Sequence, residues 1–80
     1  MEVYSLLIVN TEGTTVSQFH FPNQSLAISN AEIIGNSLAL LLKTEFEEVN
    51  AEFATREKQE VIKSYSVKGY ASMVVLKQWQ

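Results

Sequence analysis

The residues SNAEIIGNSLALLLKT, from Ser29 to Thr44, form the one long helical pattern that this sequence supports. At about 100° per residue on a helical wheel, their apolar side chains fill roughly 200° of the helix surface. A helix that packs on a single sheet needs an apolar stripe only somewhat wider than about 100°. The wider arc therefore predicts that a second surface covers this helix, in addition to the sheet of its own chain.

Local signals place the start of this helix at one of two serines. Ser29, followed three residues later by Glu32, matches a capping box, in which each side chain bonds to the backbone N–H of the other residue. Ile28 and Ile33 occupy the hydrophobic-staple positions around it. Ser25 offers a start one turn earlier, because the residues in between also tolerate a helix. The sequence leaves both starts open.

Length and charge narrow the class of protein. The 80 residues form one domain, 1–80, whose core is small and has no cysteine to reinforce it. The absence of cysteine fits an intracellular protein, and the N-terminus lacks the basic region of a secretory signal, so we expect a cytoplasmic protein without membrane insertion. The net charge is −3 and Arg56 is the single arginine, which argues against nucleic acid as a partner.

Five segments around the helix have the composition of strands. The first and the last are apolar on both faces, which is typical of central strands, whereas the third alternates apolar and polar residues. We therefore predict an α+β fold of two layers, ββαβββ, with an antiparallel five-stranded sheet in the order 2-1-5-4-3 and one main helix on one face. The expected strands are Val3–Asn10, Thr14–Phe21, Glu47–Thr55, Val61–Lys68 and Tyr70–Trp79.

The side-chain inventory argues against catalysis. The chain has no aspartate, no cysteine and one histidine, so metal clusters and Ser-His-Asp arrangements are largely excluded. His20 could pair with a glutamate, but no spacing supports an acid–base site, and a histidine in a strand is the more ordinary interpretation. We expect a protein that is not an enzyme and has no cofactor or metal.

The pattern resembles the roadblock/longin superfamily, which includes dynein light chains of the roadblock type. The resemblance rests on the opening hairpin YSLLIVNTEGTTVSQF, the apolar helix AEIIGNSLALLL and the meander EVNAEFATREKQEVIKSYSVKGYASMVVL. It implies a non-catalytic homodimer that serves as a scaffold or regulator, with a small GTPase or a larger complex as the protein partner.

The resemblance also assigns surfaces. Paired helices and joined sheet edges imply dimer contacts on the helix and on the third strand, where Gly35 and Ala39 would allow another backbone to come close. Roadblock domains usually carry a further helix that this chain lacks, so we expect part of the sheet to be left for a partner. The predicted dimer residues are Ile34, Gly35, Leu38, Ala39, Leu42, Val49, Ala51 and Phe53, and the predicted partner face includes Tyr4, Ile62 and Trp79.

Two other functions fit the same pattern. A profilin-like ligand sensor would have an enclosed apolar cavity, and a filled core would argue against it. A small inhibitory or anti-defence protein would use its shortness and acidity to block a basic surface. The sequence does not decide between these and the dimeric scaffold.

Overall fold

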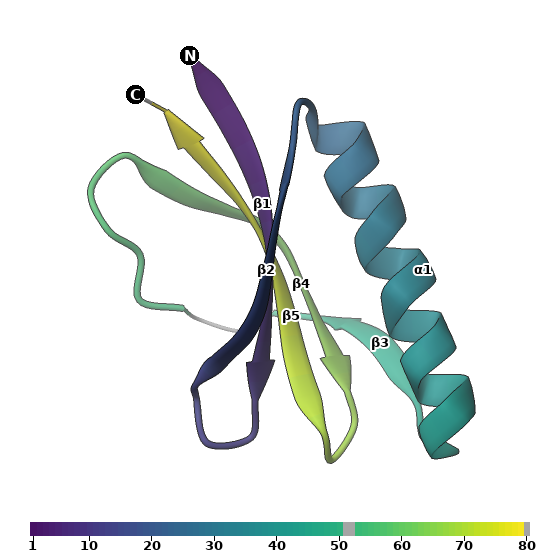
Figure 1. Ribbon diagram of the computed structural model, residues 1–80. Helices are drawn as coiled ribbons and strands as arrows, with labels where there is room; N and C mark the ends of the chain where they lie inside the picture. The colour runs from purple at the N-terminus through teal and green to yellow at the C-terminus, as the bar shows by residue number, and fades with distance from the viewer. Residues whose placement is uncertain (51–52, 80) are drawn as a thin grey trace.

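The computed structural model describes residues 1–50 and 53–79 and shows an α+β fold, with a five-stranded antiparallel sheet and one helix (Figure 1). The sheet order is β2-β1-β5-β4-β3, as the strand composition predicts. The elements are β1 (Glu2–Asn10), β2 (Thr15–Phe21), α1 (Gln24–Leu42), β3 (Phe46–Val49), β4 (Gln59–Val67) and β5 (Ala71–Trp79).

The two central strands bring the chain ends together. In the pairing of β1 with β5, Glu2 lies opposite Trp79 and Asn10 lies opposite Ala71. Figure 1 accordingly shows the two termini side by side at one end of the sheet. The two strands that are apolar on both faces therefore lie in the middle of the sheet, where both faces can be covered.

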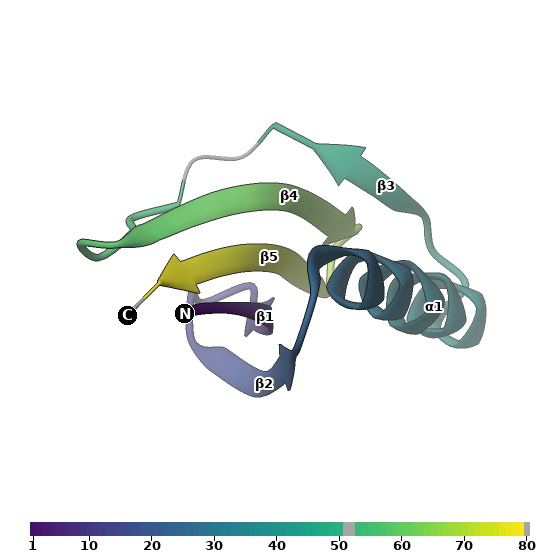
Figure 2. The same ribbon diagram turned by 90° about the horizontal axis from the view of Figure 1, so that it is seen from above.

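Helix α1 lies along one face of the sheet (Figures 1 and 2). The main core forms between this helix and the sheet, and most of its bulk comes from the strands. The buried members of this cluster are Tyr4, Leu6, Ala27, Ala31, Tyr65, Val67, Met73 and Val75. The helix thus covers the face that carries Tyr4 and Leu6.

The helix begins earlier than either serine predicts. Asn23 is the N-cap, and its side-chain Oδ1 accepts a hydrogen bond of 2.9 Å from the backbone N–H of Leu26. Ser29 lies exposed inside the helix, so the predicted capping box is wrong. Asparagine is among the best N-cap residues, and the earlier start adds a turn that buries Ala27 against the sheet.

The third strand is shorter than its alternating pattern predicts. β3 pairs with β4 from Phe46 opposite Val67 to Val49 opposite Ser64, and residues 53–55 are not in a strand. The pairing stops beside an irregularity in β4, where the register against β5 shifts between Val61 and Lys63. Such an irregularity bends a strand locally.

Candidate interaction surface

The sheet-facing side of α1 is built from small residues. Ala27, Ala31, Gly35 and Ala39 follow one another at intervals of four, and all are buried. Gly35 lies against the ring of Phe46, and a Cβ at this position would overlap that ring. The prediction that Gly35 and Ala39 lie on an exposed surface that admits a second protomer is therefore wrong, because both are buried within the protomer and Gly35 lies against the chain's own Phe46.

Two aromatic residues hold this side of the helix to the sheet. The rings of Phe46 and Tyr65 are stacked, with centroids 5.1 Å apart and planes 18° from parallel. The Tyr65 hydroxyl donates a hydrogen bond of 3.4 Å to Oε2 of Glu32 on α1. Burial, together with the neighbouring carboxylates of Glu32 and Glu48, raises the pKa of Tyr65 to about 12. Tyr65 therefore stays protonated and able to donate to the helix throughout the neutral range.

The remaining predicted helix contacts lie at the margins of the core. Ile34 and Leu38 are half-buried and pack against the core cluster. Leu42, the last residue of α1, is partly exposed. Ile34 and Leu38 thus contribute to the chain's own core, and Leu42 lies at its edge.

The side of α1 that points away from the sheet carries large apolar residues. Leu26, Ile33 and Leu40, each seven residues from the next, are 45%, 64% and 81% exposed. Leu41 beside them is 78% exposed. We call these four residues the outer ridge. Their seven-residue spacing is a sequence signal that could have identified this surface, because residues seven apart share one side of a helix.

The outer ridge is free of charge. Glu32 is the one charged residue between Gln24 and Leu42, and its side chain contacts Tyr65 on the sheet side. Among the exposed residues beside the ridge are Ser29, Asn36 and Ser37, which are small, polar and uncharged. Isolated exposed leucines are common, whereas large apolar side chains repeated along one side of a helix, with small polar residues between them, offer a surface that another molecule can cover.

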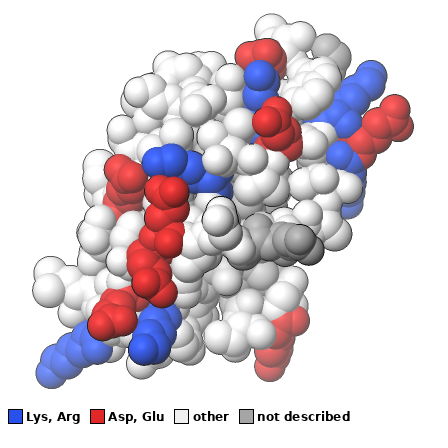
Figure 3. Space-filling model, turned by 180° about the vertical axis from the view of Figure 1, so that it is seen from behind, with Lys and Arg blue, Asp and Glu red and all other residues white. Residues whose placement is uncertain are grey.

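The β3 edge does not have the features of a pairing surface. Glu47 and Glu48 are exposed on this four-residue strand, and Lys63 Nζ lies 3.1 Å from Glu48 Oε1. Viewed from behind, acidic and basic side chains lie next to one another on this side of the molecule (Figure 3). A short, charged edge protects against pairing with another chain.

The predicted dimer residues on this edge are divided by the shorter strand. Val49 is half-buried at the end of β3, and Phe53 is half-buried beyond it, outside any strand. Ala51 lies outside the described residues. The structure therefore does not bring Val49 and Phe53 together as one exposed face of an edge strand.

The three residues of the predicted partner face do not form one surface. Tyr4 is buried under α1, so its assignment to an exposed face is wrong. Ile62, half-buried beside the irregularity in β4, packs against the same core. Trp79 is partly exposed, with Lys77 Nζ 5.7 Å from the centroid of its ring. Tyr4 and Ile62 belong to the core because the helix covers the face of the sheet that carries them.

A serine–histidine pair lies on β1 and β2 but lacks the surroundings of a catalytic site. Ser5 Oγ and His20 Nδ1 are 3.0 Å apart, and the two residues face each other in the strand pairing. Ser5 is only 2% exposed, so a substrate has no access to its hydroxyl. Within residues 1–50 and 53–79, no three histidine or glutamate side chains are grouped so that they could hold a metal ion.

Comparison with protein families, with curated proteins and with solved structures finds no match to this chain. Among the described residues, α1 is long and apolar enough to cross a membrane by length and composition alone, a test that core helices of soluble proteins also pass. In this fold, the small-residue side of α1 is buried against the sheet, and the outer ridge is exposed.

Proposed function

We propose that this chain is a non-catalytic protein-interaction domain that works as a homodimer, with the outer ridge of α1 at the centre of the dimer interface. The observation that carries the proposal is the run of Leu26, Ile33 and Leu40, which are exposed at every seventh position of a helix without a charge on that side. A patch of this kind gains free energy when it is removed from water.

A second copy of the chain is the partner that fits this surface best. A twofold dimer places the same patch on both sides of the interface, so the patch must be compatible with itself. The uncharged ridge meets this condition, since no like charges are brought together. Leu26, Ile33 and Leu40 occupy one position of a heptad, and Asn30 and Ser37 occupy the other. Polar residues at such positions set the register of paired helices at a cost in stability.

A lipid surface fits less well. Helices that lie on membranes carry lysine and arginine on their polar side, which attract anionic lipid headgroups. In α1 the one charged residue is Glu32, and the last turn has no basic residue. A helix of 19 residues is about 28 Å long, enough to span a bilayer, but spanning would require Ala31 and Gly35 to leave the core.

The proposal is tested by placing a carboxylate on the ridge. We expect the wild-type chain to be a concentration-dependent dimer in sedimentation equilibrium and in size-exclusion chromatography with light scattering. Ile33→Glu should weaken the dimer at least about 100-fold, because its charge would be buried without a partner. The far-UV circular dichroism of the variant should not change, because position 33 is exposed in the protomer.

The matched control is Ser25→Glu, which makes the same change of charge on the same helix. Ser25 is exposed in the first turn and lies off the ridge, so this variant should dimerise as the wild type does. A wild-type chain that stays monomeric at high micromolar concentration would overturn the proposal. So would equal effects of the two substitutions, or a monomer that instead binds phospholipid vesicles through Ile33.

The wider role depends on a partner that the fold does not identify. The resemblance to roadblock proteins suggests a small GTPase or a larger complex, and both remain predictions. Dimerisation through α1 would leave the opposite face of the sheet available to such a partner. Capture with the wild-type dimer, with Ile33→Glu as the comparison, would show whether the recruitment of another protein depends on dimerisation.

A further inference from the structure

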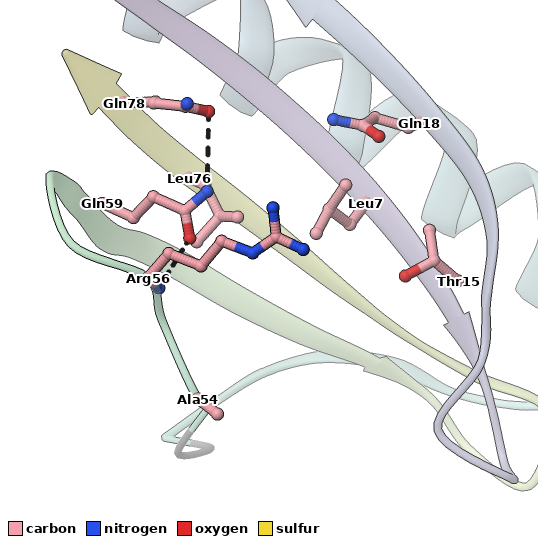
Figure 4. A pocket seen from close by; sticks show the side chains of 8 residues that line it. All are labelled: Leu7, Thr15, Gln18, Ala54, Arg56, Gln59, Leu76 and Gln78. Atoms are coloured by element: carbon pink, nitrogen blue, oxygen red, sulfur yellow. Dashed lines mark hydrogen bonds between the residues drawn. The ribbon is translucent and has the colours of Figure 1, made fainter. Parts of the chain in front are cut away.

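A pocket of about 350 Å³ lies on the face of the sheet that points away from α1 (Figure 4). Side chains from β1, β2, β4 and β5 form part of it, and the connection between β3 and β4 contributes the rest. The lining residues are Leu7, Thr15, Gln18, Ala54, Arg56, Gln59, Leu76 and Gln78. The volume is within the range of about 300–1,000 Å³ that small-molecule sites have.

Arg56 supplies the positive charge of this pocket. Its side chain extends from the connection toward Leu7 and Gln18 (Figure 4). Lys63, Lys68 and Lys77 each lie within 4 Å of a glutamate carboxylate, whereas Arg56 has no ion pair among the described residues. The one arginine of the chain therefore presents its guanidinium to solvent inside a pocket that, among the described residues, no carboxylate lines.

The backbone at Arg56 is held by hydrogen bonds to neighbouring residues. The backbone N–H of Arg56 donates a hydrogen bond of 2.9 Å to Oε1 of Gln59. The amide nitrogen of Gln59 lies 3.5 Å from Oε1 of Gln78 on β5. Gln59 thus links the backbone at Arg56 to the central part of the sheet, which fixes the point from which the arginine side chain extends. Backbone that is ordered before binding reduces the entropy lost on binding.

We propose that this pocket binds a small organic monocarboxylate that carries a neutral hydrogen-bonding group, of the class of N-acylated amino acids. The planar guanidinium of Arg56 matches a carboxylate, with which it can form two parallel hydrogen bonds. The side-chain amides of Gln18 and Gln78 offer both donors and acceptors to an amide group of the ligand. Leu7 and Leu76 provide an apolar floor for its carbon atoms.

The lining distinguishes this ligand from two similar ones. Phosphate sites commonly combine several cations or a row of backbone N–H groups, whereas this pocket has one guanidinium and neutral amides. A free amino acid would bring an ammonium group next to Arg56, and none of the described lining residues carries a carboxylate to pair with it. Acylation removes that ammonium charge and replaces it with an amide that glutamine can bind.

The test is a titration of the isotope-labelled full chain with N-acetyl-L-alanine, followed by amide NMR. Saturable shifts should appear at the side-chain amides of Gln18 and Gln78 and at the backbone amide of Arg56. Arg56→Gln should weaken binding at least about tenfold, since it removes the charge-assisted pair. Arg56→Lys should bind with intermediate affinity, because it keeps the charge but loses the planar pair of donors.

Lys58→Gln is the matched control, because it removes a cation from the same connection at a residue that does not line the pocket. It should bind the probe as the wild type does. Equal binding of the uncharged N-acetyl-L-alanine amide, or binding of inorganic phosphate or free alanine as tight as that of the probe, would overturn the proposal. So would the absence of saturable shifts. Ile33→Glu should retain binding, which separates this result from that of the dimer.

Discussion

The two sides of helix α1 differ in the size of their side chains, and the smaller ones are buried. Toward the sheet the helix presents Ala31 and Gly35, which are inaccessible to water. On the opposite side it presents Ile33 and Leu40, which are well exposed. From hydropathy alone, the side that carries Ile33 and Leu40 would be expected to be the buried one. The comparison shows that the distance of approach to the sheet decides which side of this helix is buried.

The sheet explains this arrangement. Large side chains of the strands, among them Leu6, Tyr65 and Met73, already fill the space between the layers. Phe46 extends under the helix and leaves no room for a Cβ at Gly35. Interiors are packed to nearly uniform density, so bulk supplied by one layer must be matched by small residues in the other. Leu26, Ile33, Leu40 and Leu41 of α1 are therefore left exposed on the other side of the helix.

The largest effect should come from reversing this size pattern on the buried side. We expect Gly35→Leu to reduce the free energy of unfolding by about 3 kcal/mol or more, because the new side chain would overlap the Phe46 ring. Urea denaturation followed by circular dichroism measures the change.

The matched control for that variant is Ser37→Leu, which places the same side chain on the exposed side of α1. It should leave the stability of the monomer within about 0.5 kcal/mol of the wild type. A double substitution, Gly35→Ala with Phe46→Leu, should be more stable than the sum of the single effects predicts, because the smaller residue at 46 makes room for the Cβ. Equal losses for Gly35→Leu and Ser37→Leu would contradict the assignment of the two sides.

A smaller effect on stability is expected at the N-terminus of α1, where its buried and exposed sides begin. Leu26 and Ala27, the first members of the outer ridge and of the buried side, both precede Ser29. Asn23→Ala should cost about 1 kcal/mol of stability, because the Leu26 N–H loses its acceptor. Ser29→Ala should be neutral or slightly stabilising, because Ser29 is inside the helix. Thermal unfolding of both variants measures these changes in stability. A larger loss for Ser29→Ala than for Asn23→Ala would show that Ser29, and not Asn23, caps the helix.

The smallest effect at neutral pH concerns the contact from Tyr65 to Glu32. The pKa of Tyr65 is raised in the folded chain to about 12, so the folded state holds this proton more tightly than the unfolded state does. The resulting stability is present below about pH 10, the ordinary tyrosine pKa, and is lost as the pH rises toward about 12. The wild type should therefore lose more stability than Tyr65→Phe over this interval.

The difference in tyrosinate absorbance between the wild type and Tyr65→Phe measures that pKa directly. Glu32→Gln should move the Tyr65 titration toward lower pH, because it removes a neighbouring negative charge. A difference spectrum that titrates near pH 10 in the wild type would show that Tyr65 does not lie under the helix.

The order of the elements and of the strands could be predicted from local patterns, but the candidate site could not. Strands that are apolar on both faces must be central, which was enough to place β1 beside β5. The predicted interface named Gly35 and Ala39 because small residues four apart permit close approach, but both are buried within the protomer, and the group that comes close to Gly35 is the ring of Phe46. The pocket around Arg56 unites residues from Leu7 to Gln78, for which no local signal exists.

The sequence by itself determined the fold class, the strand order and the presence of one long apolar helix, because each of these follows from the period and composition of short segments. Only the tertiary structure decided which side of that helix is buried, that β3 ends at Val49 and that Arg56 lies in a pocket. These features depend on the volume that distant side chains such as Phe46 occupy, and a pattern read along the chain does not contain that volume.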